Sequence, residues 1–293
     1  MRCYFSIWPY MKLSEYLQQA KEGHYAIGHF NFSTEDVLKA VVGAAKESGA
    51  PCVMVGTSEG ESGYIGIPEA VALVRAVAKD MDYPVFLNAD HFKTFDKCKE
   101  AIDAGYDSVI IDTSRLPMAD NIAAAKQVVE YARSVNPDIS IEGELGYLKG
   151  ASEVEKKIEI SPADYSKPEE VAEFVRQTGV NRMAVVFGNI HGIVTDQEEK
   201  LDIPHFEKIV VAAPAPAYVL HGASGLSDDD VRNSIKAGIV NVHFNTELRV
   251  AYHDEIKKQF EEKPGETTPY KYLAPAAEEV KKLVAHKLEV FRG

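Results

Sequence analysis

Short apolar runs alternate with amphipathic stretches along the whole chain, and this alternation limits the folds open to the chain more than any other feature. Short runs rich in Val and Ile are typical of parallel strands that are buried on both faces. They predict strands at residues 25–32, 51–55, 85–88, 108–112, 139–144, 183–187, 217–220 and 239–244.

The amphipathic stretches predict a helix after each of these strands, a leading helix at 13–21 and a closing helix at 275–291. The helices that follow the strands are expected at residues 35–48, 68–79, 95–104, 119–135, 168–178, 204–211, 228–237 and 247–259. Eight strand–helix units in a chain of 293 residues fit a single (β/α)8 TIM barrel with an extra N-terminal helix and a C-terminal helical extension. An open doubly wound sheet is the alternative, but no Gly-x-Gly-x-x-Gly turn follows a first strand. We therefore expect one domain over residues 1–293.

The charge and the cysteines restrict the partners and the compartment. The formal net charge of −13 argues against nucleic acid or an anionic membrane as the main partner, although a local pocket can still attract an anion. No apolar run reaches the length of about 18 residues that a membrane span needs. Cys3, Cys52 and Cys98 form no Cys-x-x-Cys pair, which indicates a reducing compartment, the cytoplasm, and no cysteine zinc site.

Residues 1–10 are apolar and aromatic, with one basic residue and no small-residue cleavage site. We therefore do not expect a signal peptide. They are either an N-terminal extension with its own docking site or a consequence of the choice of start codon, and the sequence leaves both open.

Polar residues gather where the predicted strands end, which in a barrel of this kind is the face that carries the active site. These residues are Asn31, Ser58, Asp90, His91, Asp112, Glu142, Glu144, Asn189, His191, His221, His243, Asn245 and Thr246. Among them, His91, His191 and His221 come from three different strand ends, and three histidines with an open position are typical of catalytic zinc. Taken singly, each of these histidines could be an ordinary polar residue whose hydrogen bonds are satisfied and that binds no metal. His24, His29, His205, His253 and His286 are expected to be surface or structural residues.

Glycines support the interpretation as a binding site. Gly192 and Gly222 directly follow two of the three histidines, where a glycine lets the backbone approach a ligand and its N–H can bind an anion. The loop 221–225 precedes a predicted helix, and loops in this part of a barrel frequently bind phosphate. The N–H groups of Gly222 and Ser224 and the hydroxyls of Ser224 and Thr246 are the candidate donors. A tight turn with a small-residue cap is the alternative.

Six segments in this order resemble the class II, metal-dependent ketose-bisphosphate aldolases, of which fructose-1,6-bisphosphate aldolase is the best known. The resemblance covers nearly the whole chain from about Met11. The segments are Asn88-Ala89-Asp90-His91, Ala104-Gly105-Tyr106-Asp107-Ser108-Val109-Ile110-Ile111-Asp112, Glu142-Gly143-Glu144-Leu145-Gly146, Asn189-Ile190-His191-Gly192, His221-Gly222-Ala223-Ser224-Gly225 and Thr246-Glu247-Leu248.

The resemblance implies a role for each matching residue. The three histidines would hold Zn²⁺, and Asp90 would be the acid/base at the C4 hydroxyl. Asp112 and Glu144 would either bind a second cation, divalent or monovalent, or contact the ligands of the first. Glu153, in a long polar loop that closes on the substrate, would remove the proton from dihydroxyacetone phosphate. Substrate contacts are expected from Asn31, Ser58, Gly192, Gly222, Ser224, His243, Asn245, Thr246 and Arg249.

The chemistry of the reaction agrees with a metal. Cleavage of a C–C bond beside a ketone leaves a carbanion, and zinc bound to the ketone and hydroxyl oxygens is a suitable electron sink for the enediolate. An aldolase of the other class would use a lysine Schiff base at a strand end. No lysine lies near the end of any predicted strand, and Lys149 falls in the loop beyond the fifth. We therefore expect a glycolytic lyase that reversibly cleaves fructose 1,6-bisphosphate to dihydroxyacetone phosphate and glyceraldehyde 3-phosphate.

Three departures from the family pattern bear on the substrate. His243 and Asn245 stand where the family usually has Asn and Asp, residues 193–195 lack the usual lysine, and 269–271 lack the usual arginine. Tagatose bisphosphate or a related ketose phosphate, or a sulfonated ketose, is therefore an alternative substrate. A non-catalytic aldolase-like barrel and a metal-dependent hydrolase are further alternatives, but residues 28–31 lack the His-x-His with which such hydrolases usually open.

Members of this family are commonly homodimers or larger homo-oligomers. The predicted closing helix carries Leu283, Val284, Leu288 and Phe291 at helical spacing. This stripe either forms a subunit contact or packs on its own barrel.

Overall fold

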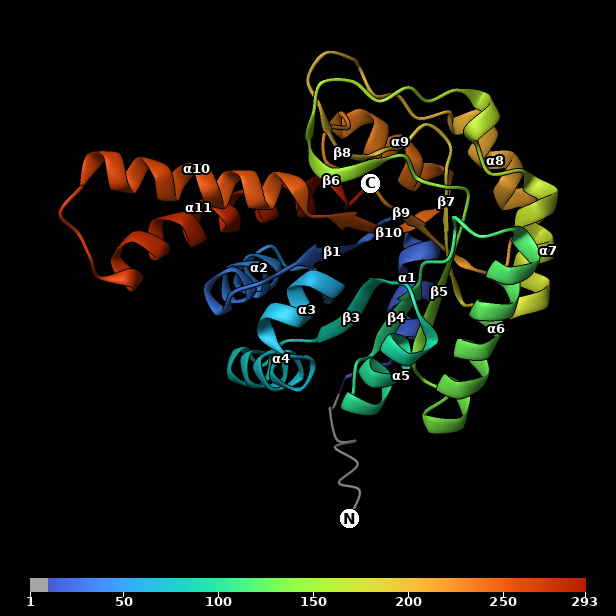
Figure 1. Ribbon diagram of the computed structural model, residues 1–293, viewed down its shortest axis with the longest axis horizontal. Coiled ribbons are helices and arrows are strands. Elements are labelled where there is room, and N and C mark those ends of the chain that lie inside the picture. The colour runs from blue at the N-terminus through green and yellow to red at the C-terminus, as the bar shows by residue number, and fades with distance from the viewer. Residues whose placement is uncertain (1–9) are drawn as a thin grey trace.

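Eight parallel strands close into a barrel in the computed structural model, which describes residues 10–293 (Figure 1). Around the barrel the order is β1-β10-β9-β7-β5-β4-β3-β2. The bounds are β1 Ile27–Asn31, β2 Val53–Ser58, β3 Val85–Phe92, β4 Ser108–Ile111, β5 Ser140–Leu145, β7 Arg182–Val185, β9 Ala217–Leu220 and β10 Ile239–Phe244. The predicted TIM-barrel fold is confirmed. The predicted N-terminal extension, residues 1–10, lies outside the described residues except for its last residue.

Helices follow every barrel strand and cover the outside of the barrel (Figure 1). They are α2 Glu35–Glu47, α3 Glu59–Ile65, α4 Ile67–Met81, α5 Phe95–Ala104, α6 Met118–Val135, α7 Pro168–Thr178, α8 Ile203–Ala212, α9 Asp228–Ala237 and α10 Thr246–Glu262. Among residues 10–293, no helix has the length and apolar character that crossing a bilayer requires.

The leading helix, α1 Leu13–Gly23, packs on the first residues of the strands. Its buried Leu13 and Leu17 join Ile27, Met54 and Val240 in one apolar cluster. Because this cluster fills the amino end of the barrel, the opposite, carboxyl end remains for a polar site.

Four segments predicted as loop are regular. β3 continues four residues past its predicted end, so Asp90 and His91 belong to the strand. The helix α3 is capped by Ser58, which exchanges hydrogen bonds with Glu61 in a capping box. β6 Gly150–Glu155 and β8 His191–Val194 pair in parallel as a separate two-stranded sheet, which the polar composition of both loops hides from sequence analysis.

The C-terminal extension is a helical hairpin of α10 and α11 Pro269–Val290 that projects from the barrel (Figure 1). The expected start at Pro275 is wrong, because Pro269 occupies the first turn and Pro275 lies inside the helix. Val284, Leu288 and Phe291 are buried, and the ring of Phe291 stacks on Phe30 of β1. The apolar stripe therefore packs on its own barrel.

Candidate active site

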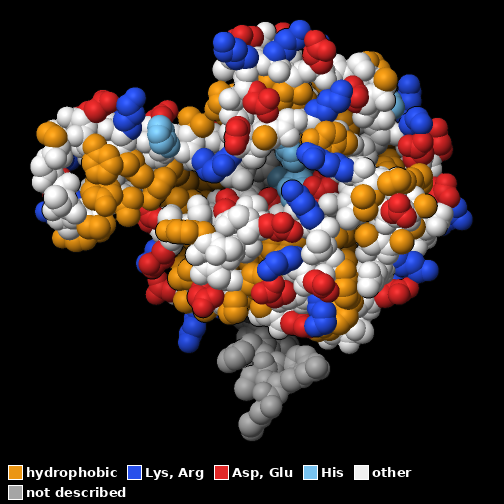
Figure 2. Space-filling model, viewed as in Figure 1, with side chains coloured by type: hydrophobic (Ala, Val, Ile, Leu, Met, Phe, Trp, Pro, Cys, Tyr) orange, Lys and Arg blue, Asp and Glu red, His pale blue; other side chains and the backbone are white. Residues whose placement is uncertain are grey.

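Three histidines meet at the carboxyl end of the barrel. His91 lies near the end of β3, His191 opens β8, and His221 directly follows β9. One ring nitrogen of each lies within 4.8 Å of the others, and His91 Nε2 is 2.9 Å from His221 Nδ1. Figure 2 shows histidine side chains in a hollow of the visible face, with lysine and arginine side chains around it.

Carboxylates hold the far nitrogens of two of these rings. Asp112 Oδ2 lies 3.1 Å from His91 Nδ1, and Glu144 Oε2 lies 3.5 Å from the same atom. Glu142 Oε1 lies 2.6 Å from His221 Nε2. A carboxylate accepts a hydrogen bond from the nitrogen that it faces, so His91 Nε2 and His221 Nδ1 are the nitrogens that would bind a metal in place of a proton.

The electrostatics of the cluster favour a cation. Burial lowers the pKa of His191 well below its ordinary value, so its ring is neutral and can act as a ligand. Burial also lowers the pKa of His91, but Asp90, Asp112 and Glu144 outweigh this effect and raise it to about 10. Burial and the charge of Asp112 raise the pKa of Glu144 to about 8, and its Oε2 is buried without a hydrogen bond. Imidazole nitrogens beside carboxylates form a donor set that suits a divalent transition metal.

Asp90 lies beside this cluster and is held from two sides. Its Oδ2 accepts a hydrogen bond from Asn31 Nδ2 at 2.9 Å, and the same amide donates to Glu61 Oε2. Its Oδ1 lies 3.3 Å from His243 Nδ1, and neither atom has a hydrogen-bond partner. Burial raises the pKa of Asp90, but the histidines, His91 first, lower it to about 2, so the carboxylate is ionised at neutral pH.

The two glycines that follow histidines are required by the packing of the loops. Gly192 and Gly222 have φ of +100° and +69°. A Cβ on Gly222 would lie 1.9 Å from the carbonyl oxygen of Ile190, and one on Gly192 would lie 2.3 Å from that of Glu153. Neither position admits another residue without movement of the backbone.

Several predicted contact residues already have other partners. Ser58 caps α3, and Ser224 Oγ accepts a hydrogen bond from Glu247 N at 3.4 Å. Thr246 Oγ1 lies 2.9 Å from Ser152 Oγ, to which the exposed Arg249 donates at 3.1 Å. Asn245 is the residue that precedes α10.

Glu153 is not brought into the histidine cluster. It lies in β6, and its side chain is exposed. Its predicted part in the reaction therefore requires a movement of this segment.

Four residues near the cluster were not assigned a role from the sequence. His29, expected to be surface or structural, is buried inside the barrel and stacks on His243 with ring centroids 3.7 Å apart. Its position two residues before Asn31 on β1 places both on the same face of the strand, which was an available signal. Glu142 and Arg182 are buried below the histidines, and the partly buried Glu61 accepts from Asn31 beside them.

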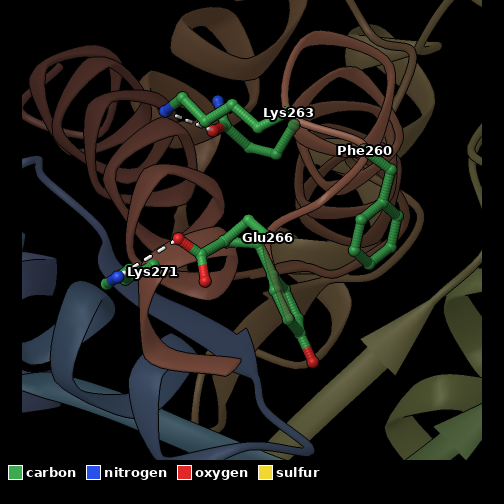
Figure 3. Close-up of a pocket in the computed structure, with 6 residues that line it drawn as sticks. Phe260, Lys263, Glu266 and Lys271 are labelled. Atoms are coloured by element: carbon green, nitrogen blue, oxygen red, sulfur yellow. Dashed lines mark hydrogen bonds and ion pairs between the residues drawn. The ribbon is translucent and has the colours of Figure 1, made fainter. Parts of the chain in front are cut away.

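A separate cavity of about 360 Å³ lies on the α10–α11 hairpin. Figure 3 shows Phe260, Lys263, Glu266 and Lys271 around it, with Lys271 paired to Glu266 at 3.2 Å. It lies outside the barrel and contains none of the residues described above.

Comparison with known proteins identifies the family of the chain. The family model of class-II fructose-bisphosphate aldolases matches residues 11–293. The chain belongs to this family. As a class-II aldolase it is a lyase, so the prediction from the six segments is confirmed and a divalent metal is implied. Family membership also favours the aldolase over the hydrolase considered above.

Proteins similar to this chain carry more than one aldolase name. The chain is 35% identical over 286 residues to the fructose-bisphosphate aldolase of Staphylococcus aureus (strain Mu50), with 97% of both chains covered. It is 36% identical over 285 residues to the 6-phospho-5-dehydro-2-deoxy-D-gluconate aldolase of Bacillus licheniformis, with 96% of this chain and 94% of that one covered. Among solved structures, the YdjI aldolase of Escherichia coli K12 matches with a TM-score of 0.82 at 27% identity, covering 95% of this chain and 96% of that one.

Proposed function

We propose that this aldolase reversibly cleaves fructose 1,6-bisphosphate to dihydroxyacetone phosphate and glyceraldehyde 3-phosphate, with Zn²⁺ as its metal. The observation that carries the proposal is the convergence of nitrogens from His91, His191 and His221 beside the ionised Asp90. The S. aureus relative supports the choice of substrate.

The three histidines would hold the metal. Its chemistry when bound is that of a Lewis acid, which polarises the ketone of the substrate and stabilises the charge left on the ketose half. Asp112 and Glu144 hold His91 in position and offer carboxylate oxygens to a second cation, divalent or monovalent.

Asp90 is the proposed acid/base of the cleavage step. It is ionised, and Asn31 fixes its orientation, so it can take the proton from the C4 hydroxyl as that oxygen becomes the aldehyde carbonyl. Glu153 is the proposed base for the carbon of dihydroxyacetone phosphate in the reverse direction. Because Glu153 is exposed on β6, the β6–β8 sheet has to act as a lid that carries it to the substrate.

A phosphate of the substrate is placed at the loop 221–225 and the start of α10. The N–H groups of Gly222 and Ser224, with the Ser224 and Thr246 hydroxyls, are the proposed donors there. Arg249 is the proposed contact for the second phosphate, and Gly192, Asn245, Ser58 and Asn31 line the remaining wall. The lysines and arginines around the hollow supply a local positive field despite the net charge of −13 (Figure 2).

A second candidate substrate is another phosphorylated ketose or keto acid. The B. licheniformis relative is as similar in sequence as the S. aureus one, 36% against 35% identical, and His243 stands where the family usually has Asn. We therefore propose one test for both: purified protein is assayed with fructose 1,6-bisphosphate, tagatose 1,6-bisphosphate and 6-phospho-5-dehydro-2-deoxygluconate, each after chelation and after zinc is restored.

The expected result is zinc-dependent cleavage, fastest with fructose 1,6-bisphosphate. Faster turnover of another substrate would replace the proposed one. Zinc binding without turnover of any of the three would support the non-catalytic barrel.

A cytoplasmic homodimer with one domain per chain is the proposed form of the enzyme. The hairpin of α10 and α11 supports it, because Phe260 and Tyr270 are exposed by 47% and 71% on an element that projects from the barrel.

A further inference from the structure

Arg182 is completely buried inside the barrel, below the three histidines. It opens β7, and its guanidinium contacts one carboxylate and four uncharged side chains. The partners are Glu142 Oε2 at 2.8 Å, Asn241 Oδ1 at 2.9 Å, Asn88 Oδ1 at 3.0 Å, Ser140 Oγ at 3.1 Å and Ser108 Oγ. Because arginine has only donors, the oxygens of the four uncharged side chains must accept from it, while Glu142 Oε2 contacts it as an ion pair.

One branch of this network reaches a proposed metal ligand. Arg182 takes Oε2 of Glu142, and the other oxygen faces His221 Nε2 at 2.6 Å. A carboxylate can only accept, so the proton of His221 sits on Nε2 and its Nδ1 keeps a free lone pair. That Nδ1 lies 2.9 Å from His91 Nε2, at the point where the histidines converge.

A second branch reaches His243. The amide of Asn241 is fixed twice, because its Oδ1 accepts from Arg182 and its Nδ2 donates to the carbonyl of Ile27 at 2.9 Å. His243 Nε2 lies 3.2 Å from that oxygen and therefore carries the proton. Its Nδ1 is then a bare acceptor that faces Asp90.

A third branch reaches His29. Asn88 Oδ1 accepts from Arg182, so its amide nitrogen donates to His29 Nε2 at 3.1 Å. The rings of His29 and His243 are nearly parallel, at 11°. Their lone pairs therefore lie in two stacked, nearly parallel planes, which argues against one metal ion bound in line with both rings and shared by His29, His243 and Asp90.

Stability alone does not account for this arrangement. Removing an arginine from water is costly, and a buried ion pair can often be replaced by apolar side chains of similar volume without loss. The fixed proton positions are what an apolar replacement would not supply.

We propose that Arg182 is a positioning residue of the metal centre, which acts through Glu142 to hold His221 as the tautomer that presents Nδ1 to the metal. The proposal rests on the proposed metal site, but not on the identity of the sugar. It predicts that substitution of Arg182 weakens metal binding, although Arg182 is not itself a ligand.

The test measures zinc affinity by competition with a chelator, with no sugar present. Arg182→Met is expected to weaken zinc binding about 10–100-fold, the usual effect of losing such a supporting contact. Arg182→Lys, which can still pair with Glu142, should recover part of the loss. Arg75→Met is the matched control, because Arg75 pairs with Asp107 at 2.8 Å in a partly exposed site between α4 and β4. It should leave zinc affinity unchanged.

A double variant separates positioning from packing. In Glu142→Gln, Arg182 still pairs with the side-chain oxygen at position 142, so the amide nitrogen faces His221. That nitrogen donates to Nε2 and favours the tautomer with the proton on Nδ1, which cannot bind the metal through Nδ1. In the double variant Arg182→Met/Glu142→Gln the amide is free to turn its oxygen to His221. The double variant should therefore bind zinc at least as tightly as Glu142→Gln alone.

Histidine ¹⁵N spectra of the metal-free protein give a readout that does not require zinc. The His221 signals should show the Nε2–H tautomer in the wild type and lose it in Glu142→Gln, even if Arg182→Met fails to fold. Any of three results would overturn the proposal. These are wild-type zinc affinity in Arg182→Met, an unchanged His221 tautomer in Glu142→Gln, and losses of zinc affinity in the double variant that equal the sum of the two single losses. A wild type that binds zinc and cleaves no sugar would instead overturn the proposed function and leave this inference standing.

Discussion

Asp90 Oδ1 and His243 Nδ1 lie 3.3 Å apart in the floor of the pocket, and no hydrogen bond joins them. Both atoms are buried, and with His243 protonated on Nε2 both are acceptors. Two buried acceptors that face each other are each left without a donor, and a group that donates a proton from beside them would satisfy them. A substrate hydroxyl can donate there, which agrees with the proposed role of Asp90.

Asp90→Asn should abolish the acid/base step and keep the metal. The amide is nearly the same size and can still contact Asn31, but it cannot take a proton. We expect turnover to fall about 10²–10⁴-fold, the usual range for loss of a general base. Zinc content should equal that of the wild type, and a loss of zinc would mean that Asp90 supports the metal instead.

His191→Ala should remove the metal. His191 is the one histidine of the three whose ring has no carboxylate contact at hydrogen-bond distance among the described residues, so its contribution is that of a ligand alone. Elemental analysis should show zinc well below one equivalent per chain, and activity should fall with it. His205→Ala is the control, because His205 bonds to the carbonyl of Ser166 on the outside of the barrel.

The sequence was sufficient to find the three histidines and Asp90, because the carboxyl ends of parallel strands meet at one face of a barrel. It was not sufficient to find their supports. Arg182 is charged and directly precedes an apolar run, so the predicted strand began at the next residue and left Arg182 outside the barrel. Which histidine Glu142 faces depends on side-chain packing across the barrel interior, which no local pattern encodes. The capping box at Ser58 and Glu61 was visible in the sequence but lay in a stretch read as loop.

Gly222→Ala should be much more harmful than Gly49→Ala. Both glycines have nearly the same φ, +69° and +70°, so both substitutions carry the strain of a left-handed residue, about 1 kcal/mol. A Cβ at Gly49 meets nothing within 4 Å, whereas one at Gly222 meets the Ile190 carbonyl at 1.9 Å. Denaturant unfolding should show an extra loss of about 1–3 kcal/mol for Gly222→Ala. Equal losses would mean that the loop relaxes freely.

Glu153→Gln should slow proton exchange at the carbon of dihydroxyacetone phosphate without changing zinc affinity. Glu153 is exposed on β6 in this conformation, so its proposed effect depends on movement of β6. Exchange of the substrate proton with deuterated water, followed by NMR, isolates this step from C–C cleavage. Glu159→Gln, an exposed residue of the same segment, is the control and should leave exchange unchanged.

Glu199 should make the stability of the protein fall as the pH rises from about 5 to 8. Its carboxylate is buried, and burial, with a further contribution from the charge of Glu247, outweighs a contact with the backbone of Val194 and raises its pKa to about 8. The folded state therefore keeps this proton at a pH where the unfolded chain, with an ordinary glutamate, has lost it. This contribution to the free energy of unfolding is fully present below the pKa of Glu199 in the unfolded chain. It is lost as the pH rises through the pKa of Glu199 in the folded state. Glu199→Gln, which stays neutral, should flatten this part of the profile in thermal unfolding at pH 5, 6, 7 and 8. Glu198→Gln, at the exposed neighbouring position, should retain the wild-type slope, and the same slope in Glu199→Gln would show that Glu199 ionises normally.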